Sequence, residues 1–210
     1  MRKYLFGTLV FALAFVILSV SLMRTSSISY ALATTIPSPT PSDLSIKTPE
    51  IDYDIPYEGR ILPDNPLWTI KAVRDRVWYI FSFNPLKKAE LALLFSDKRL
   101  LAAKALFESK KPDIALSTLT KGEKYLQIAV DEEVKARNKG IDTTSFLKKL
   151  AMSSLKHRQL IEDVLKFVPE DGKPEVIKFE EYSKNAYKSS RDVLNSKGEQ
   201  APINPFEGLN

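Results

Sequence analysis

A repeated set of helix-start and helix-stop residues is the strongest constraint on the fold. Three segments rich in Leu, Ala, Lys and Glu begin at Pro85, Pro112 and Pro174, and a fourth begins at Asp142 or Thr143. Proline is tolerated in the first turn of an α-helix because the N–H that it lacks has no partner there. Glycine or proline ends each segment. The predicted helices cover residues 85–110, 112–139, 142–168 and 173–197.

These four helices are long, and the connections between them are short. Each helix of about 23–28 residues is roughly 35–42 Å long. Helices of similar length that are joined by a few residues must run antiparallel to their neighbours. Apolar residues recur at helical spacing, and no segment alternates with the period of a strand. The sequence therefore predicts an all-α fold, an antiparallel bundle of four long helices, in which the first helix is the most central.

A shorter, aromatic-rich helix is predicted ahead of the bundle, over residues 66–81. Asp64 or Asn65 can cap its first N–H groups, and Pro66 suits its first turn. Two interpretations of its rings stay open. They close one end of the core, which we favour because Trp and Tyr commonly seal core edges, or they form a ligand platform or a helix at a membrane interface. The aromatic residues in question are Trp68, Trp78, Tyr79 and Phe83.

The N-terminal end carries an export signal. Arg2 and Lys3 precede the twenty uncharged residues 4–23, enough to cross a bilayer as a helix. Ala31-Leu32-Ala33 has the small-x-small pattern of a signal-peptidase site, so residues 1–33 form either a cleaved signal peptide or an uncleaved anchor helix. Both alternatives place the rest of the chain outside the cytoplasm, because the basic N-terminal end stays inside.

Composition divides the remainder of the chain. Residues 34–51 are rich in Pro, Ser and Thr and predict a disordered linker. The helical bundle domain covers residues 52–198, and residues 199–210 are expected to form a flexible tail. Residues 34–210 contain 28 basic and 26 acidic residues in alternation. This mixing is typical of a solvated surface rather than of a nucleic-acid-binding face, so no nucleic-acid partner is expected.

Few residues are available for catalysis or metal binding. The chain has no cysteine and one histidine, His157, which is preceded three positions earlier by Ser154 rather than by the Glu of a di-metal helix motif. We expect His157 at the surface or the edge of the bundle. Glu90, Asp97 and Glu123 could approach one another if they faced inward, as a carboxylate pair does for acid–base chemistry, but surface pairing with nearby Lys or Arg is the simpler expectation. No catalytic, cofactor-binding or metal-ligating residue is predicted, and nucleotide-binding and nucleophile-elbow motifs are absent from the sequence.

Several short motifs resemble a known family. The more specific of them is the entry segment from Asp52-Tyr53 to Asn65-Pro66-Leu67-Trp68. Further similar segments are Phe83-Asn84-Pro85-Leu86-Lys87-Lys88-Ala89-Glu90-Leu91, Asp97-Lys98-Arg99-Leu100, Lys121-Gly122-Glu123-Lys124-Tyr125-Leu126 and Ser154-Leu155-Lys156-His157. Over roughly residues 52–195 the chain resembles the domain of unknown function numbered 5667, found in extracytoplasmic proteins of bacteria and archaea. The resemblance implies a helical domain behind a signal or anchor, and it implies no reaction or catalytic residue.

The sequence thus favours a non-enzymatic, extracytoplasmic helical module, membrane-anchored through residues 4–23 or secreted, with a structural or protein-interaction role at the cell envelope. Its partner would be an envelope protein, and no cofactor is expected. The alternative is a ligand-binding or sensing domain, whose pocket between the aromatic helix and the bundle would be lined by Trp68, Trp78 and Phe83. An inward carboxylate cluster around His157 would instead favour an enzyme.

Overall fold

The computed structural model describes residues 48–207, which are all-helical and contain no strand. The predicted all-α fold class is confirmed. The prediction also included an N-terminal hydrophobic helix, which lies outside the described residues. The third bundle helix ends earlier than predicted, because its last turn tightens into a 3-10 helix. The elements are α2 (Trp68–Phe81), α3 (Pro85–Glu108), α4 (Pro112–Asn138), α5 (Thr144–Val164), η1 (Leu165–Phe167) and α6 (Lys173–Ser196).

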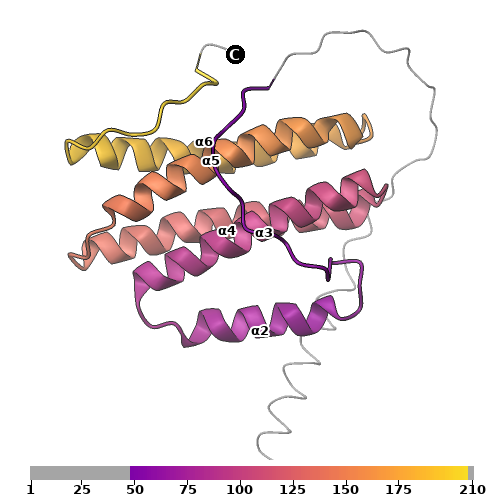
Figure 1. Ribbon diagram of the computed structural model, residues 1–210, viewed down its shortest axis with the longest axis horizontal. Coiled ribbons are helices and arrows are strands. Elements are labelled where there is room, and N and C mark those ends of the chain that lie inside the picture. The colour runs from indigo at the N-terminus through magenta and orange to yellow at the C-terminus, as the bar shows by residue number, and fades with distance from the viewer. Residues whose placement is uncertain (1–47, 208–210) are drawn as a thin grey trace, which may run out of the picture. The chain divides into compact units, whose positions relative to one another are not determined.

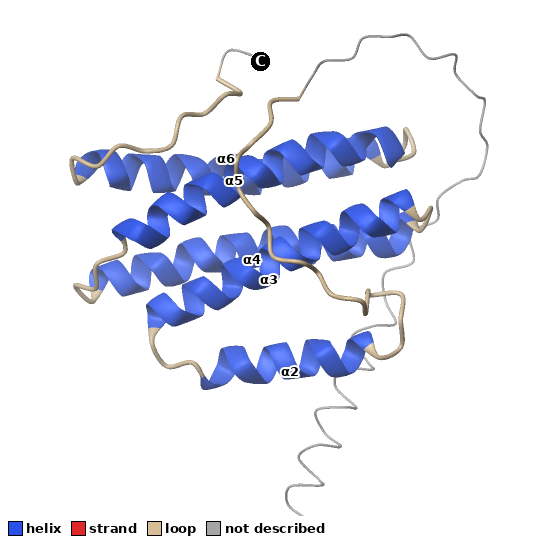
Figure 2. Cartoon of the chain, viewed as in Figure 1, coloured by secondary structure: helices blue, strands red, loops and turns tan. Residues whose placement is uncertain are grey.

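The long helices form two antiparallel hairpins that pack on each other (Figure 1). α3 pairs with α4 and α5 pairs with α6, while α4 also contacts α6 and α3 also contacts α5. The shorter α2 lies beside α3 at the edge of the bundle opposite α6 (Figure 2). This is the predicted antiparallel bundle of four long helices, preceded by a shorter aromatic-rich helix.

Local chemistry explains where the helices begin and end. The Asn84 side-chain oxygen accepts hydrogen bonds from the N–H groups of Leu86 at 2.8 Å and Lys87 at 3.4 Å, which caps α3 ahead of Pro85. α4 ends two residues before Gly140, whose φ of 75° is a conformation that L-residues rarely adopt. The short connections that follow from these caps hold neighbouring helices antiparallel.

Two apolar clusters form the core of the bundle. One contains Leu100, Leu106, Leu119 and Ile161, and the other contains Leu93, Leu126, Phe146 and Leu150. Each such buried side chain contributes roughly 1.5–3 kcal/mol to folding. α3 and α4 approach closely at Gly122, where an added Cβ would lie 3.3 Å from the Arg99 Cβ.

The two ends of the described chain pack on α5 and α6. Ile51 is buried, and its N–H donates to the Gln159 side chain at 2.9 Å. Phe206 is 1 % exposed, lies beneath the Arg158 guanidinium and shares a cluster with Ile51 and Tyr187. Residues 199–207 are therefore not the free tail that we expected, because an aromatic side chain near their end fills a core site.

Within residues 48–207, no helix combines the length and the hydropathy needed to cross a membrane. The predicted apolar span over residues 4–23 and the predicted cleavage site after Ala33 lie outside the described residues.

Candidate functional site

α2 turns its apolar side away from the bundle. An amphipathic surface helix normally buries its apolar stripe, yet the only buried residue of α2 is Asp75. Ile70 is 68 % exposed and Phe81 is 69 % exposed. We call the exposed apolar residues of this segment the α2 face; they are Leu67, Ile70, Val73, Val77, Trp78, Ile80, Phe81 and Phe83.

Polar and aromatic contacts hold α2 in this orientation. The Tyr79 hydroxyl donates to Glu132 Oε1 at 3.3 Å, and burial together with the Glu132 charge raises the pKa of Tyr79 to about 12. The Lys71 ammonium donates to the Glu58 carbonyl and lies 4.5 Å from the centre of the Trp68 ring, and burial lowers its pKa. These contacts fix how α2 lies against the bundle and against the segment that precedes it.

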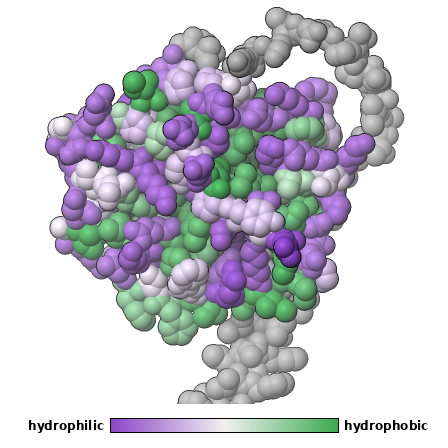
Figure 3. Space-filling model, in the orientation of Figure 1, coloured by the Kyte–Doolittle hydropathy of each residue, from purple (hydrophilic) through white to green (hydrophobic). Residues whose placement is uncertain are grey.

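The exposed charges of α2 are all positive. Arg74 and Arg76 are exposed, while the single acid of the helix, Asp75, is buried and bound to Arg74 at 2.7 Å. The α2 face is therefore an apolar surface with basic flanks. Figure 3 shows hydrophobic residues gathered along the lower margin of the molecule, where α2 lies.

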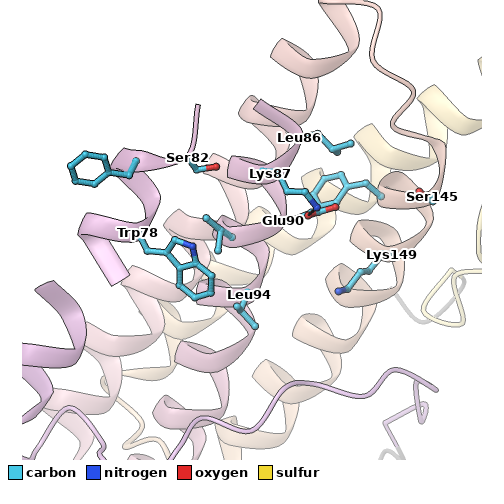
Figure 4. A pocket seen from close by; sticks show the side chains of 11 residues that line it. Trp78, Ser82, Leu86, Lys87, Glu90, Leu94, Ser145 and Lys149 are labelled. Carbon is cyan, nitrogen blue, oxygen red and sulfur yellow. Dashed lines mark hydrogen bonds and ion pairs between the residues drawn. The ribbon is translucent and has the colours of Figure 1, made fainter. Parts of the chain in front are cut away.

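A groove adjoins the end of α2 that leads into α3. It has a volume of about 810 Å³ and lies between the end of α2, the start of α3 and the start of α5. Figure 4 shows Trp78 of α2 on one side and Ser145 and Lys149 of α5 on the other, with the α3 residues Lys87, Glu90 and Leu94 between them. Lys87 and Glu90 form an ion pair at 2.7 Å. The apolar lining consists of Trp78, Phe81, Leu86, Leu91, Leu94 and Phe146.

Of the three residues predicted to line a pocket here, only Trp78 does so. Its ring packs edge-on against Phe95, with ring centres 6.5 Å apart, and remains 54 % exposed. Trp68 lies at the other end of α2 beneath Lys71, and Phe83 is 85 % exposed. The helical rise could have excluded the predicted pairing, because Trp68 and Trp78 lie ten residues, or about 15 Å, apart along α2 and do not reach one pocket.

His157 is not at the bundle surface as expected, but fully buried between two carboxylates. Its Nδ1 lies 2.7 Å from Glu123 Oε1 and its Nε2 lies 3.1 Å from Asp97 Oδ1. Both ring nitrogens can donate only when the imidazole is charged. Burial acts to lower the pKa of His157, but Glu123 and Asp97 outweigh it and raise the pKa to about 9.

Further hydroxyls stabilise Asp97. The hydroxyls of Ser153 and Tyr53 donate to its two oxygens at 2.7 and 2.8 Å. Burial and the Asp97 charge raise the pKa of Tyr53. Among residues 48–207, Glu123 Oε2 is buried without a hydrogen-bond partner. The cluster thus joins α3, α4 and α5 to the segment that precedes α2.

The expectation of surface carboxylates is correct for Glu90 and wrong for Asp97 and Glu123. Glu90 is exposed and pairs with Lys87, whereas Asp97 is 1 % exposed and Glu123 is 0 % exposed. The sequence signal for burial that was missed is the position of Glu123 along its helix. Glu123 falls between Leu119 and Leu126 on the apolar stripe of its helix, where a core residue is expected.

The geometry of this cluster is that of a structural ion network. Its charged members are sealed from solvent, and each ring nitrogen of His157 already faces a protein carboxylate. Across residues 48–207, no group of three or more His, Asp or Glu side chains is arranged to hold a metal ion. The exposed α2 face is therefore the better candidate for contact with another molecule.

Comparison with known proteins gives one match. A family model described as "Domain of unknown function (DUF5667)" matches residues 60–171, from the segment before α2 to the end of the α5–α6 connection. No curated protein and no solved structure matches the chain. Since the matched region covers more than half of the sequence, the chain belongs to the DUF5667 family of domains of unknown function.

Proposed function

We propose that this protein is a non-enzymatic helical module that acts outside the cytoplasm at the cell envelope, and that the α2 face is its binding surface. The exposed apolar side of α2 is the observation that carries this proposal. Monomeric soluble proteins rarely leave large contiguous apolar patches in water, and such patches typically mark interaction sites.

An inward carboxylate cluster around His157 is present, as the enzyme alternative required, but its burial supports a non-enzymatic role. A catalytic acid or base must come within hydrogen-bond reach of its substrate. His157, Asp97 and Glu123 are enclosed by α3, α4 and α5 and are engaged with one another or with hydroxyl groups. This arrangement suits cohesion of the bundle.

The envelope location is supported by the sequence alone. The uncharged residues 4–23 behind Arg2 and Lys3 favour export of everything that follows. The mixed charges of the helical domain give no reason to expect a nucleic-acid partner.

Photo-crosslinking of the full chain in intact cells tests the proposal. A photoreactive residue replaces Ile70 on the α2 face or, as a matched control, the exposed Lys178 on α6. We expect a crosslinked product at position 70 that is absent at position 178 and is lost when Phe81→Ser is added. Equal products at both positions would contradict the proposal, as would products that consist of cytoplasmic proteins.

A second candidate function is binding of a small amphipathic ligand in the groove. Its volume of about 810 Å³ and its apolar lining, including Trp78, favour this alternative. Palmitate is a suitable probe, with Trp78 fluorescence as the readout in a Trp68→Phe background. We expect binding that Leu94→Trp abolishes by filling the groove, whereas a response that Leu94→Trp leaves unchanged would exclude this site.

A further inference from the structure

We propose that the α2 face docks onto the surface of an anionic lipid bilayer. This inference rests on the proposed function, in which the α2 face is a binding surface, and it names the chemistry of the partner. Three properties of the described residues carry it: the arrangement of apolar side chains, the sign of the surrounding charge and the length of the preceding chain.

The apolar side chains of α2 suit the boundary between headgroups and acyl chains. Helices that lie in this boundary combine Trp, Phe and Leu on one side with Lys or Arg beside them. Trp78, Phe81 and Phe83 are all more than half exposed at the end of α2, and Ile70 extends the same surface toward its start. Aromatic rings are enriched at the headgroup level of membranes.

The charge around the α2 face favours an anionic surface. Arg76 is exposed, and Arg74 is exposed although it pairs with the buried Asp75 at 2.7 Å. Long arginine side chains can reach headgroups while their methylene stems cover apolar surface. Each basic residue near an anionic leaflet strengthens attraction to it. A second copy of the chain would instead place these arginines near one another, with no exposed acid on α2 to pair with them.

The groove continues this surface. Trp78 and Phe81 belong both to the α2 face and to the groove lining. In the same lining Lys87 is paired with Glu90, and the exposed Lys149 adds positive charge beside the apolar side chains.

The length of the preceding chain places a bilayer within reach. Twenty-four residues, 24–47, separate the predicted apolar span from Thr48. A chain of 24 residues spans at most about 80 Å when it is fully extended. The described chain begins beside α5 and α6, at the edge opposite α2, but this reach exceeds the length of the longest helix of the bundle, roughly 40 Å. A predicted anchor at residues 4–23 would therefore leave the α2 face able to reach the membrane, where an intramolecular docking step needs only weak intrinsic affinity.

The test uses the absence of native cysteine. Val77→Cys on the α2 face and Lys178→Cys on α6 are each labelled with an environment-sensitive fluorophore, and the full chain is reconstituted into phosphatidylcholine vesicles with or without phosphatidylglycerol. A lipid-attached quencher reports contact with the bilayer. We expect a blue shift and quenching at position 77 in phosphatidylglycerol vesicles, weaker quenching in phosphatidylcholine alone, and none at position 178.

A charge variant separates docking from simple proximity. Arg76→Glu should lower the ratio of docked to undocked protein by about fivefold or more, because it removes one attractive charge and adds a repulsive one. Lys178→Glu makes the same charge change on α6 and should leave the ratio unchanged. An equal effect of the two variants would overturn the proposal.

The lipid-docking proposal would also be overturned if quenching at position 77 were no greater than at position 178. The crosslinking experiment at Ile70 then distinguishes failure of this proposal from failure of the proposed function. If Ile70 still gives a specific protein product, the α2 face binds a protein or a second copy, and the proposed function stands without the lipid inference. If Ile70 gives no specific product either, both fail.

Discussion

At the scale of single residues, the ionic cluster around His157 sets how the stability of the bundle depends on pH. Its charged imidazole is held between Glu123 and Asp97, and these carboxylates raise its pKa to about 9 against the opposing effect of burial. The charged form is therefore favoured by folding.

The raised pKa predicts a loss of stability at alkaline pH. A group whose pKa is higher in the folded state contributes its full stabilisation below the unfolded pKa of about 6.5, and this contribution is lost as the pH rises through the folded value. The free energy of unfolding should fall by up to about 3 kcal/mol between about pH 6.5 and about pH 9. Urea unfolding at several pH values measures it. His157→Gln should remove the dependence, and identical pH profiles for the two proteins would contradict the prediction.

The two carboxylates of the cluster should differ in their importance. Asp97 accepts hydrogen bonds from Ser153, Tyr53 and His157, so the amide of Asp97→Asn would oppose donors with its own N–H groups. We expect a loss of about 3 kcal/mol from Asp97→Asn.

Glu123→Gln is the matched change, because it keeps the acceptor for His157 and alters an oxygen that already lacks a partner. Its cost should be smaller, about 1 kcal/mol. Chemical denaturation compares the two variants, and a larger loss for Glu123→Gln would refute this ranking.

At the scale of helices, caps and breaks account for the accuracy of the predicted boundaries. Proline, asparagine and glycine act through local backbone chemistry, so Pro85, Pro112 and Gly140 could be interpreted without tertiary information. The orientation of α2 on the bundle could not be predicted without tertiary information. Periodicity identifies its apolar side, but which side meets the bundle depends on contacts such as Tyr79 with Glu132. The inward cluster escaped prediction for the same reason, since its members come from three helices.

The capping of α3 should be measurable in stability. Asn84 accepts two backbone N–H groups at the start of a long, buried helix, so Asn84→Ala should cost about 1 kcal/mol. Asn65 accepts one exposed N–H, from Leu67, ahead of the loosely packed α2, and Asn65→Ala should cost less. Thermal unfolding of both variants checks this, and equal losses would contradict it.

The α2 face should contribute little to the stability of the fold. Phe81 is 69 % exposed, so Phe81→Ser should leave the midpoint of urea unfolding almost unchanged. Phe95 is 2 % exposed beneath α2, and Phe95→Ala should lower stability by about 3–5 kcal/mol. A large loss from Phe81→Ser would mean that this side chain belongs to the core and is not free to bind a partner.

At the scale of the whole described domain, the residues that stabilise the bundle and the residues of the proposed binding surface lie in different parts of the structure. The bundle buries its apolar clusters and its ionic network among α3, α4 and α5, and both ends of the described chain close over α5 and α6. α2 lies apart at the opposite edge (Figure 1). This separation leaves one apolar surface available while the rest of the domain satisfies its own contacts.

Cysteine accessibility in intact cells tests the central claim, that a covered α2 face operates outside the cytoplasm. Ile80→Cys on the α2 face and Lys178→Cys on α6 are exposed to a membrane-impermeant thiol reagent, against a background without native cysteine. The account predicts rapid labelling at position 178, slow labelling at position 80, and equal rates once the domain is unfolded. Rapid labelling at both positions would show that nothing covers the α2 face, and no labelling at either would place the domain inside the cytoplasm.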